Sequence, residues 1–120
     1  SKGLAKESES VEGYDLVVKQ VDVSGWNELL TSLDNLKNKT SVAALASVFD
    51  GKVALAVYVS PQVQEKGITA TKLVDEVKDI LGGGGGGRED VARAGGSNVD
   101  AIGETLKRIR QILRESLGEK

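Results

Sequence analysis

The residues that could do chemistry in this chain lie in one glycine-rich stretch, GGGGGGREDVARAGG, at residues 82–96. Glycine has no Cβ, so a glycine backbone lets its N–H groups approach a phosphate or a sugar closely. Two arginines lie within the same stretch, and guanidinium groups bind phosphate oxygens through charge-assisted hydrogen bonds. These residue types favour contact with a nucleic-acid backbone. The residues predicted to form this surface are Gly82, Gly83, Gly84, Gly85, Gly86, Gly87, Arg88, Arg93, Gly95 and Gly96.

Three other interpretations of the glycine run fit its surroundings less well. A P-loop needs Gly-Lys followed by Ser or Thr, whereas this chain has Gly-Arg-Glu. A dinucleotide-binding fingerprint follows a strand, and the pattern before residue 82 is helical. A flexible linker suits the composition, but it would join two amphipathic helices that share one core. We therefore expect an ordered surface segment, in which valine at Gly84 and Gly85 leaves the fold largely intact.

Composition excludes several kinds of site. The 120-residue chain contains no cysteine and no histidine, so it lacks disulfides, thiolate ligands and the commonest general base. Its formal net charge of −2 argues against coating of nucleic acid by bulk charge, but it allows a local basic site. No apolar run approaches the ~20 residues of a membrane helix, and no secretory signal opens the chain. We expect one domain with no catalytic residue, no metal site, no cofactor and no membrane partner.

Hydrophobic spacing predicts the elements that must hold the glycine stretch in place. Residues 14–23 are rich in valine and predict a strand that is buried on both faces near its middle. Residues 26–38 carry Trp and Leu at helical spacing and predict an amphipathic helix. Residues 41–49 and 52–59 are apolar on both faces and are joined by Asp-Gly, which predicts a hairpin at the centre of the sheet.

The second half of the chain predicts two more helices, one on each side of the glycine stretch. Pro61 ends the second strand of the hairpin, and a polar loop follows it. The next helix has its hydrophobic staple at Ile68 and Leu73, and Gly82 is its C-cap. An apolar stripe from Val99 onward predicts the last helix. The predicted N-caps of the three helices are Asp22 or Ser24, then Thr69, then Ser97 or Asn98.

The predicted order is strand, helix, strand, strand, helix, glycine-rich segment and helix. A strand-helix-strand unit favours a right-handed parallel crossover, and the hairpin adds an antiparallel pair. The fold class is therefore α/β (mixed α+β), with a central mixed sheet flanked by helices. We expect residues 14–118 to form this globular domain. Residues 1–13 are polar and predict a tail or the end of an upstream helical segment.

A second group of cations lies on the last predicted helix. Lys107, Arg110 and Arg114 share one face at spacings of three and four residues, beside the apolar stripe. Rows of this kind are commonly solvated helix faces. As a hypothesis, this row supplies secondary phosphate contacts to a bound nucleic acid.

The stretch GGGGGGREDVARAGG closely resembles the glycine-rich signature at the C-terminus of bacterial alanyl-tRNA synthetases. That signature is a glycine run, then Arg, often Pro, Asp, a small apolar step, Ala, a polar residue, Ala and Gly-Gly. Glu89 stands where Pro is frequent, which is a minor departure. The resemblance extends over nearly the whole chain after residue 13. It identifies a member of the DHH-associated domain family, which also occurs in DHH-type phosphoesterases and exonucleases.

The residue after the glycine run distinguishes the two branches of this family. The phosphoesterase branch has a Gly-Gly-Gly-His pattern, whereas this chain has Arg88 there and no histidine. The resemblance therefore favours the synthetase branch. It implies a non-catalytic C-terminal domain that holds tRNA(Ala) at its elbow, where the D and T loops meet, so that aminoacylation and editing act on one tRNA.

The resemblance also implies the setting of this domain. The parent would be an ATP-dependent alanine-tRNA ligase of the cytoplasm. ATP with Mg²⁺, and Zn²⁺ in the editing domain, would be bound by other parts of that enzyme. The implied partners are tRNA(Ala) and the aminoacylation and editing domains.

Two alternatives stay open, and a third fits the sequence poorly. The chain could be a structural or dimerisation module, in which an upstream helical segment pairs two copies into a homodimer. It could be the substrate-binding half of a DHH-type phosphoesterase. An RNA-recognition motif begins with the same element order, but it needs exposed aromatic residues on its third element, and residues 52–59 offer only Tyr58.

Overall fold

The computed structural model describes residues 8–11 and 13–118 of the chain. In chain order the elements are β1 (Ser8–Val11), β2 (Tyr14–Gln20), α1 (Trp26–Leu36), β3 (Val42–Phe49), β4 (Lys52–Val59), α2 (Pro61–Gln64), α3 (Ala70–Leu81), β5 (Gly83–Gly87), β6 (Val91–Gly96), the 3₁₀-helix η2 (Val99–Ala101) and α4 (Ile102–Leu117).

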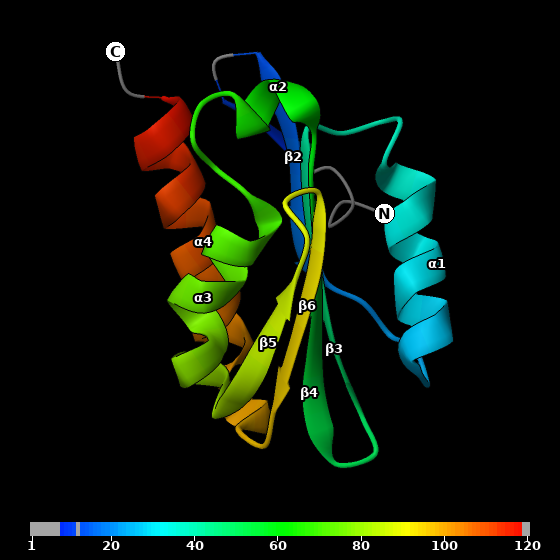
Figure 1. The fold of residues 1–120 in the computed structure, drawn as a ribbon. Coiled ribbons are helices and arrows are strands. Elements are labelled where there is room, and N and C mark those ends of the chain that lie inside the picture. The colour runs from blue at the N-terminus through cyan, green and yellow to red at the C-terminus, as the bar shows by residue number, and fades with distance from the viewer. Residues whose placement is uncertain (1–7, 12, 119–120) are drawn as a thin grey trace.

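Six strands form one mixed sheet in the order β1-β2-β3-β4-β6-β5. β2 and β3 are parallel and α1 connects them, while the other neighbouring strands of the described sheet are antiparallel. Figure 1 shows the sheet nearly edge-on between two helical layers. The helices α3 and α4 cover one face, and α1 covers the other. The fold is therefore a three-layer mixed α/β arrangement, which confirms the predicted fold class.

Each face of the sheet has its own hydrophobic core, and β2 contributes to both. Leu16 and Val18 belong to the core under α3 and α4. Val17 points the other way and packs in the core under α1, with Leu29 and Leu33. Successive side chains of a strand point to opposite faces, so three adjacent apolar residues indicate a strand covered on both sides. The predicted burial of β2 on both faces is confirmed, but the strand ends at Gln20 and not at residue 23.

The predicted central hairpin is also confirmed. β3 and β4 occupy the middle of the sheet, and the turn between them has φ 56° at Asp50 and φ 74° at Gly51. Two positive φ angles define the type I′ turn that suits a two-residue hairpin.

Both predicted ends of α3 are found. Thr69 caps α3, since its hydroxyl accepts a 3.1 Å hydrogen bond from the backbone N–H of Lys72. Gly82 ends α3 in the left-handed conformation, at φ 77°.

The glycine stretch departs from the predicted element order. The sequence pattern predicts no strand within residues 82–96, but β5 and β6 form an antiparallel hairpin there. Glycine has a low strand propensity and no side chain to show alternation, so a five-glycine strand gives no signal of its own.

A second difference follows Pro61, where the pattern predicts a loop and the chain forms the short helix α2. Proline is favoured at the first position of a helix.

Two predicted N-caps are wrong. The N-cap of α1 is Gly25, and Glu28 instead accepts hydrogen bonds from the backbone N–H and the hydroxyl of Ser24, at 2.6 and 2.7 Å. The backbone hydrogen bond is the main cause that lowers the pKa of Glu28 below its ordinary value. Asn98 precedes η2 rather than α4, and its side-chain amide donates a 3.0 Å hydrogen bond to the carbonyl oxygen of Ile80.

The prediction for residues 1–13 lies largely outside the described residues. Within that range Ser8–Val11 forms the edge strand β1, antiparallel to β2, with Val11 opposite Tyr14. The alternative of dimerisation through an upstream helical segment concerns parts that the structure does not describe, and it stays a prediction.

Candidate nucleic-acid interface

The glycine run forms the outermost strand of the sheet. All five residues of β5 are exposed, and β5 pairs with β6 alone among the described strands. The hairpin closes with a 2.8 Å hydrogen bond from the backbone N–H of Arg88 to the carbonyl oxygen of Val91. The segment is therefore a regular edge strand inside the domain rather than a linker.

Three glycines of β5 are required by the close approach of its backbone to β6. A Cβ added to Gly85 would lie 2.6 Å from the Cβ of Ala94, and a Cβ on Gly83 or Gly87 would also overlap the β6 backbone. We call Gly83, Gly85 and Gly87 the strand-facing glycines. The expectation that valine at Gly85 leaves the fold intact is therefore wrong. Gly96 is constrained in the same way, because its Cβ would overlap the carbonyl group at the end of α3.

The strand-facing glycines also present the free backbone of the edge. The backbone N–H of Arg88 donates the hydrogen bond to Val91 that closes the hairpin, so these two residues form a bonded pair. Bonded and non-bonded residues alternate along an antiparallel pair, so Gly83, Gly85 and Gly87 direct their N–H and C=O groups away from β6. Polar backbone groups at a sheet edge are available to a ligand.

Gly84 and Gly86, which we call the open-face glycines, have different surroundings. Nothing lies within 4 Å of a Cβ added to either residue. The register places them opposite Gly95 and Arg93, on the side of the sheet that α1 covers. Packing within the described part of the chain therefore gives no reason for glycine at these two positions. Their effect is a shelf of bare backbone beside Arg93.

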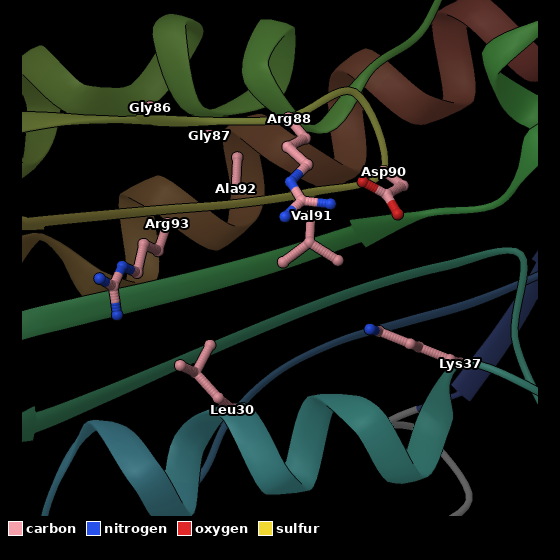
Figure 2. Close-up of a pocket in the computed structure, with 9 residues that line it drawn as sticks. All are labelled: Leu30, Lys37, Gly86, Gly87, Arg88, Asp90, Val91, Ala92 and Arg93. Atoms are coloured by element: carbon pink, nitrogen blue, oxygen red, sulfur yellow. The ribbon is translucent and has the colours of Figure 1, made fainter.

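Two open grooves lie over this shelf. The helix α1 packs over β3 and β4, which leaves the α1-side face of the β5–β6 hairpin accessible. The larger groove has a volume of about 530 Å³. In Figure 2, Leu30 of α1 and Lys37, the residue after this helix, lie across this groove from Arg88 and Arg93 of the hairpin. The smaller groove, of about 410 Å³, has Trp26 and Arg93 on its wall and the glycine shelf as its floor.

Arg88 and Arg93 are the two arginines of this surface, and both are available to a ligand. Neither forms an ion pair or a side-chain hydrogen bond within residues 8–11 and 13–118. Arg93 instead lies over the ring of Trp26, with its Cζ 5.1 Å from the ring centroid, which is cation–π range. Lys37 pairs with Asp34 at 2.8 Å. A guanidinium group has five N–H donors, so the two arginines can offer several hydrogen bonds to phosphate.

The predicted basic row on α4 lies elsewhere and is partly occupied. Arg110 donates a 2.6 Å hydrogen bond from Nη2 to the carbonyl oxygen of Val18, and Arg114 also has a partner within the chain. Lys107 is exposed. Because α4 covers the face opposite α1, the structure does not bring this row together with the shelf (Figure 1).

The structure adds to this surface two residues of α1 and the residue that follows it, none of which the sequence pattern selects. Helical spacing predicts Trp26 and Leu30 as core residues, but both are half-buried and line the grooves. Lys37 follows the last turn of α1 and lines the larger groove. No signal near these residues in the sequence points to β6, because only the parallel crossover places α1 beside the glycine hairpin.

Within residues 8–11 and 13–118, no group of three or more His, Cys, Asp or Glu side chains could hold a metal ion. None of the described helices is both long and apolar enough to cross a membrane.

Residues 13–115, which include β2 to β6 and nearly all of α4, match the DHHA1 domain family. The chain belongs to this family. This DHHA1 domain is 40% identical over 107 residues to the alanine–tRNA ligase of Bacillus thuringiensis (strain Al Hakam), covering 88% of this chain and 12% of that protein. It is 41% identical over 105 residues to the same enzyme of Geobacillus thermodenitrificans (strain NG80-2), covering 86% and 12%. The domain therefore spans about an eighth of the length of these relatives.

The fold of this DHHA1 domain is similar to that of a solved structure, the C-Ala domain of Aquifex aeolicus alanyl-tRNA synthetase. The TM-score is 0.75 at 31% identity, and the match covers 92% of this chain and 97% of the other. The resemblance to the C-terminal domain of alanyl-tRNA synthetases is thereby confirmed.

Proposed function

We propose that this DHHA1 domain binds tRNA(Ala) at its elbow, as a non-catalytic part of an alanyl-tRNA synthetase. The observation that carries the proposal is the pair of guanidinium groups at Arg88 and Arg93. Both lack acidic partners in the described structure, and both face open grooves beside a strip of bare backbone. The chain has no histidine and no cysteine, so the proposed role is binding rather than catalysis.

The shape of the site suits a folded RNA. Tertiary RNA surfaces are recognised largely by shape and by contacts to phosphates and 2′-hydroxyl groups. The open-face glycines let such a surface approach the sheet without side chains in the way, and the strand-facing glycines offer N–H groups along the edge. With a net charge of −2, the domain lacks the bulk charge for strong non-specific binding. It suits a module that adds affinity to a larger enzyme.

The curated relatives indicate the setting. Both are alanine–tRNA ligases, of which this chain covers 12%. We propose that the aminoacylation and editing domains of the same enzyme are partners of this domain in the cytoplasm, and that ATP, Mg²⁺ and Zn²⁺ are bound by those other domains. The row of Lys107, Arg110 and Arg114 stays a proposal for secondary phosphate contacts; Lys107 and Arg114 are exposed, and Arg110 is half-buried.

The proposal is tested by fluorescence anisotropy with a labelled tRNA(Ala) transcript and with an acceptor-stem minihelix that lacks the elbow. We expect the 120-residue chain to bind the transcript at least tenfold more tightly than the minihelix. Equal affinity for the two RNAs would contradict binding at the elbow, and absence of binding to both would contradict the function.

A matched pair of double variants locates the surface. Arg88→Ala with Arg93→Ala removes two charges from the α1 side, and Lys72→Ala with Lys78→Ala removes two from α3, on the opposite face. We expect the arginine variant to weaken binding and the lysine variant to bind nearly as the parent does. Equal losses from the two variants would place the RNA elsewhere or make the binding non-specific.

A further inference from the structure

Trp26, Arg93 and the open-face glycines form an arrangement with features that binding of a phosphate group alone would not need. Trp26 lies above β6, since a Cβ on Gly95 would be 3.9 Å from its Cζ2 atom. Phe49 meets the edge of the indole, with ring centroids 5.8 Å apart in a T-shaped contact. Trp26 is the first residue of α1, and these contacts hold its ring beside the smaller groove.

Arg93 is held over that ring. Its Cζ lies 5.1 Å from the ring centroid, and no carboxylate of the described residues competes for it. A planar guanidinium that lies over an aromatic ring can accept a second planar group, because arginine stacks readily on flat π systems. The side chain of Arg93 is exposed, so such a group can reach it from solvent.

The space next to Arg93 is open and has the form of a shelf. Gly86 is opposite Arg93 on the neighbouring strand, and Gly84 is opposite Gly95, at the place where Trp26 lies. No Cβ rises from either open-face glycine, and the groove over them has a volume of about 410 Å³. Any larger side chain at these positions would enter that groove.

We propose that one unstacked nucleobase of the bound RNA lies on the shelf of Gly84 and Gly86 and stacks with Arg93, so that Trp26, Arg93 and the base form one stack. This inference rests on the proposed function and adds to it a contact with a base. The charge of Arg93 and the aromatic ring behind it favour a nucleobase over a peptide or a lipid, because base recognition commonly combines a cation with a stacking platform.

The test separates the positive charge of the Arg93 side chain from its planar shape. Arg93→Lys keeps the charge but removes the planar group, and Arg88→Lys is the matched control on the same hairpin. With the tRNA(Ala) transcript, we expect Arg93→Lys to weaken binding about tenfold while the salt dependence stays unchanged, since a stacked base is worth about that much. Arg88→Lys should lose less than threefold, because a lysine can replace a guanidinium at a single phosphate.

A second measurement uses Trp26, the only tryptophan of the chain. Its emission should change when the transcript binds, and inorganic polyphosphate at equal phosphate concentration should leave it unchanged. Gly86→Val should suppress the effect of the transcript, whereas Gly103→Ala on α4, where an added Cβ also meets nothing within 4 Å, should not.

The outcomes separate this inference from the function on which it rests. If the transcript binds but Arg93→Lys binds it as tightly as the parent does, or if polyphosphate changes the emission as the transcript does, the base contact is overturned and tRNA binding stands. If the transcript does not bind at all, both fall together.

Discussion

Nη2 of Arg110 donates a 2.6 Å hydrogen bond to the carbonyl oxygen of Val18, a residue 92 positions earlier in the chain. This hydrogen bond ties the last helix, α4, to β2 near the start of the chain. A residue that the helical pattern suggests for phosphate binding thus has a structural partner.

Replacement of Arg110 by alanine should destabilise the domain. The carbonyl group would lose a charge-assisted, partly buried hydrogen bond, which is worth about 1–3 kcal/mol. Urea unfolding followed by circular dichroism measures the change. Lys107→Ala removes an exposed charge from the same helix and should change the stability by less than about 0.5 kcal/mol. If the two variants unfold at the same urea concentration, the hydrogen bond contributes nothing measurable.

Alanine at Gly85 and alanine at Gly84 should have opposite consequences for stability. Gly85→Ala places a Cβ 2.6 Å from the Cβ of Ala94, and we expect a loss of about 1–3 kcal/mol from overpacking. Gly84→Ala meets open space and should be neutral or stabilise by up to about 1 kcal/mol, because it restricts the unfolded chain. Thermal unfolding of the two variants decides the matter. Equal melting temperatures would contradict the alternation of strand-facing and open-face glycines.

Arg88→Ala should weaken binding of the tRNA(Ala) transcript by about 1–2 kcal/mol, because a charge-assisted contact to phosphate is lost. The slope of log K against log salt concentration should fall by about 0.7–0.9, which corresponds to one phosphate. Titrations at three or more salt concentrations give both quantities. A reduced affinity with an unchanged slope would show that Arg88 acts without neutralising a phosphate.

Glu28 should make the stability of the domain depend on pH in acid solution. Its pKa in the folded domain is lowered from its ordinary 4.5, first by the backbone hydrogen bond to Ser24 and then by the hydroxyl of the same residue. A lowered pKa means that the carboxylate stabilises the fold above the unfolded-state pKa, and this contribution is lost as the pH falls through the folded-state value. Between about pH 5 and pH 3, the parent should therefore lose more stability than Glu28→Gln. Unfolding curves of both proteins at several pH values test this, and parallel pH profiles would count against it.

Elements whose side chains alternate or repeat could be predicted from the sequence. The three adjacent apolar residues of β2, the Asp50-Gly51 turn and the Thr69 cap are set by local contacts and backbone preferences, and each is found where the pattern places it. The family signature at residues 82–96 also needs no structure to be detected, because its residue types and order are unusual.

Tertiary structure alone decided what the glycine stretch is. A strand of glycines has no side chains to carry a periodic pattern, so only pairing with β6 makes β5 a strand and divides its residues into strand-facing and open-face glycines. The position of Trp26 beside Arg93 likewise depends on the crossover that carries α1 over the sheet. Local sequence patterns determine most of the helices and strands. Contacts between segments that are distant in the sequence depend instead on the order of the strands in the whole sheet, because this order decides which backbones lie side by side.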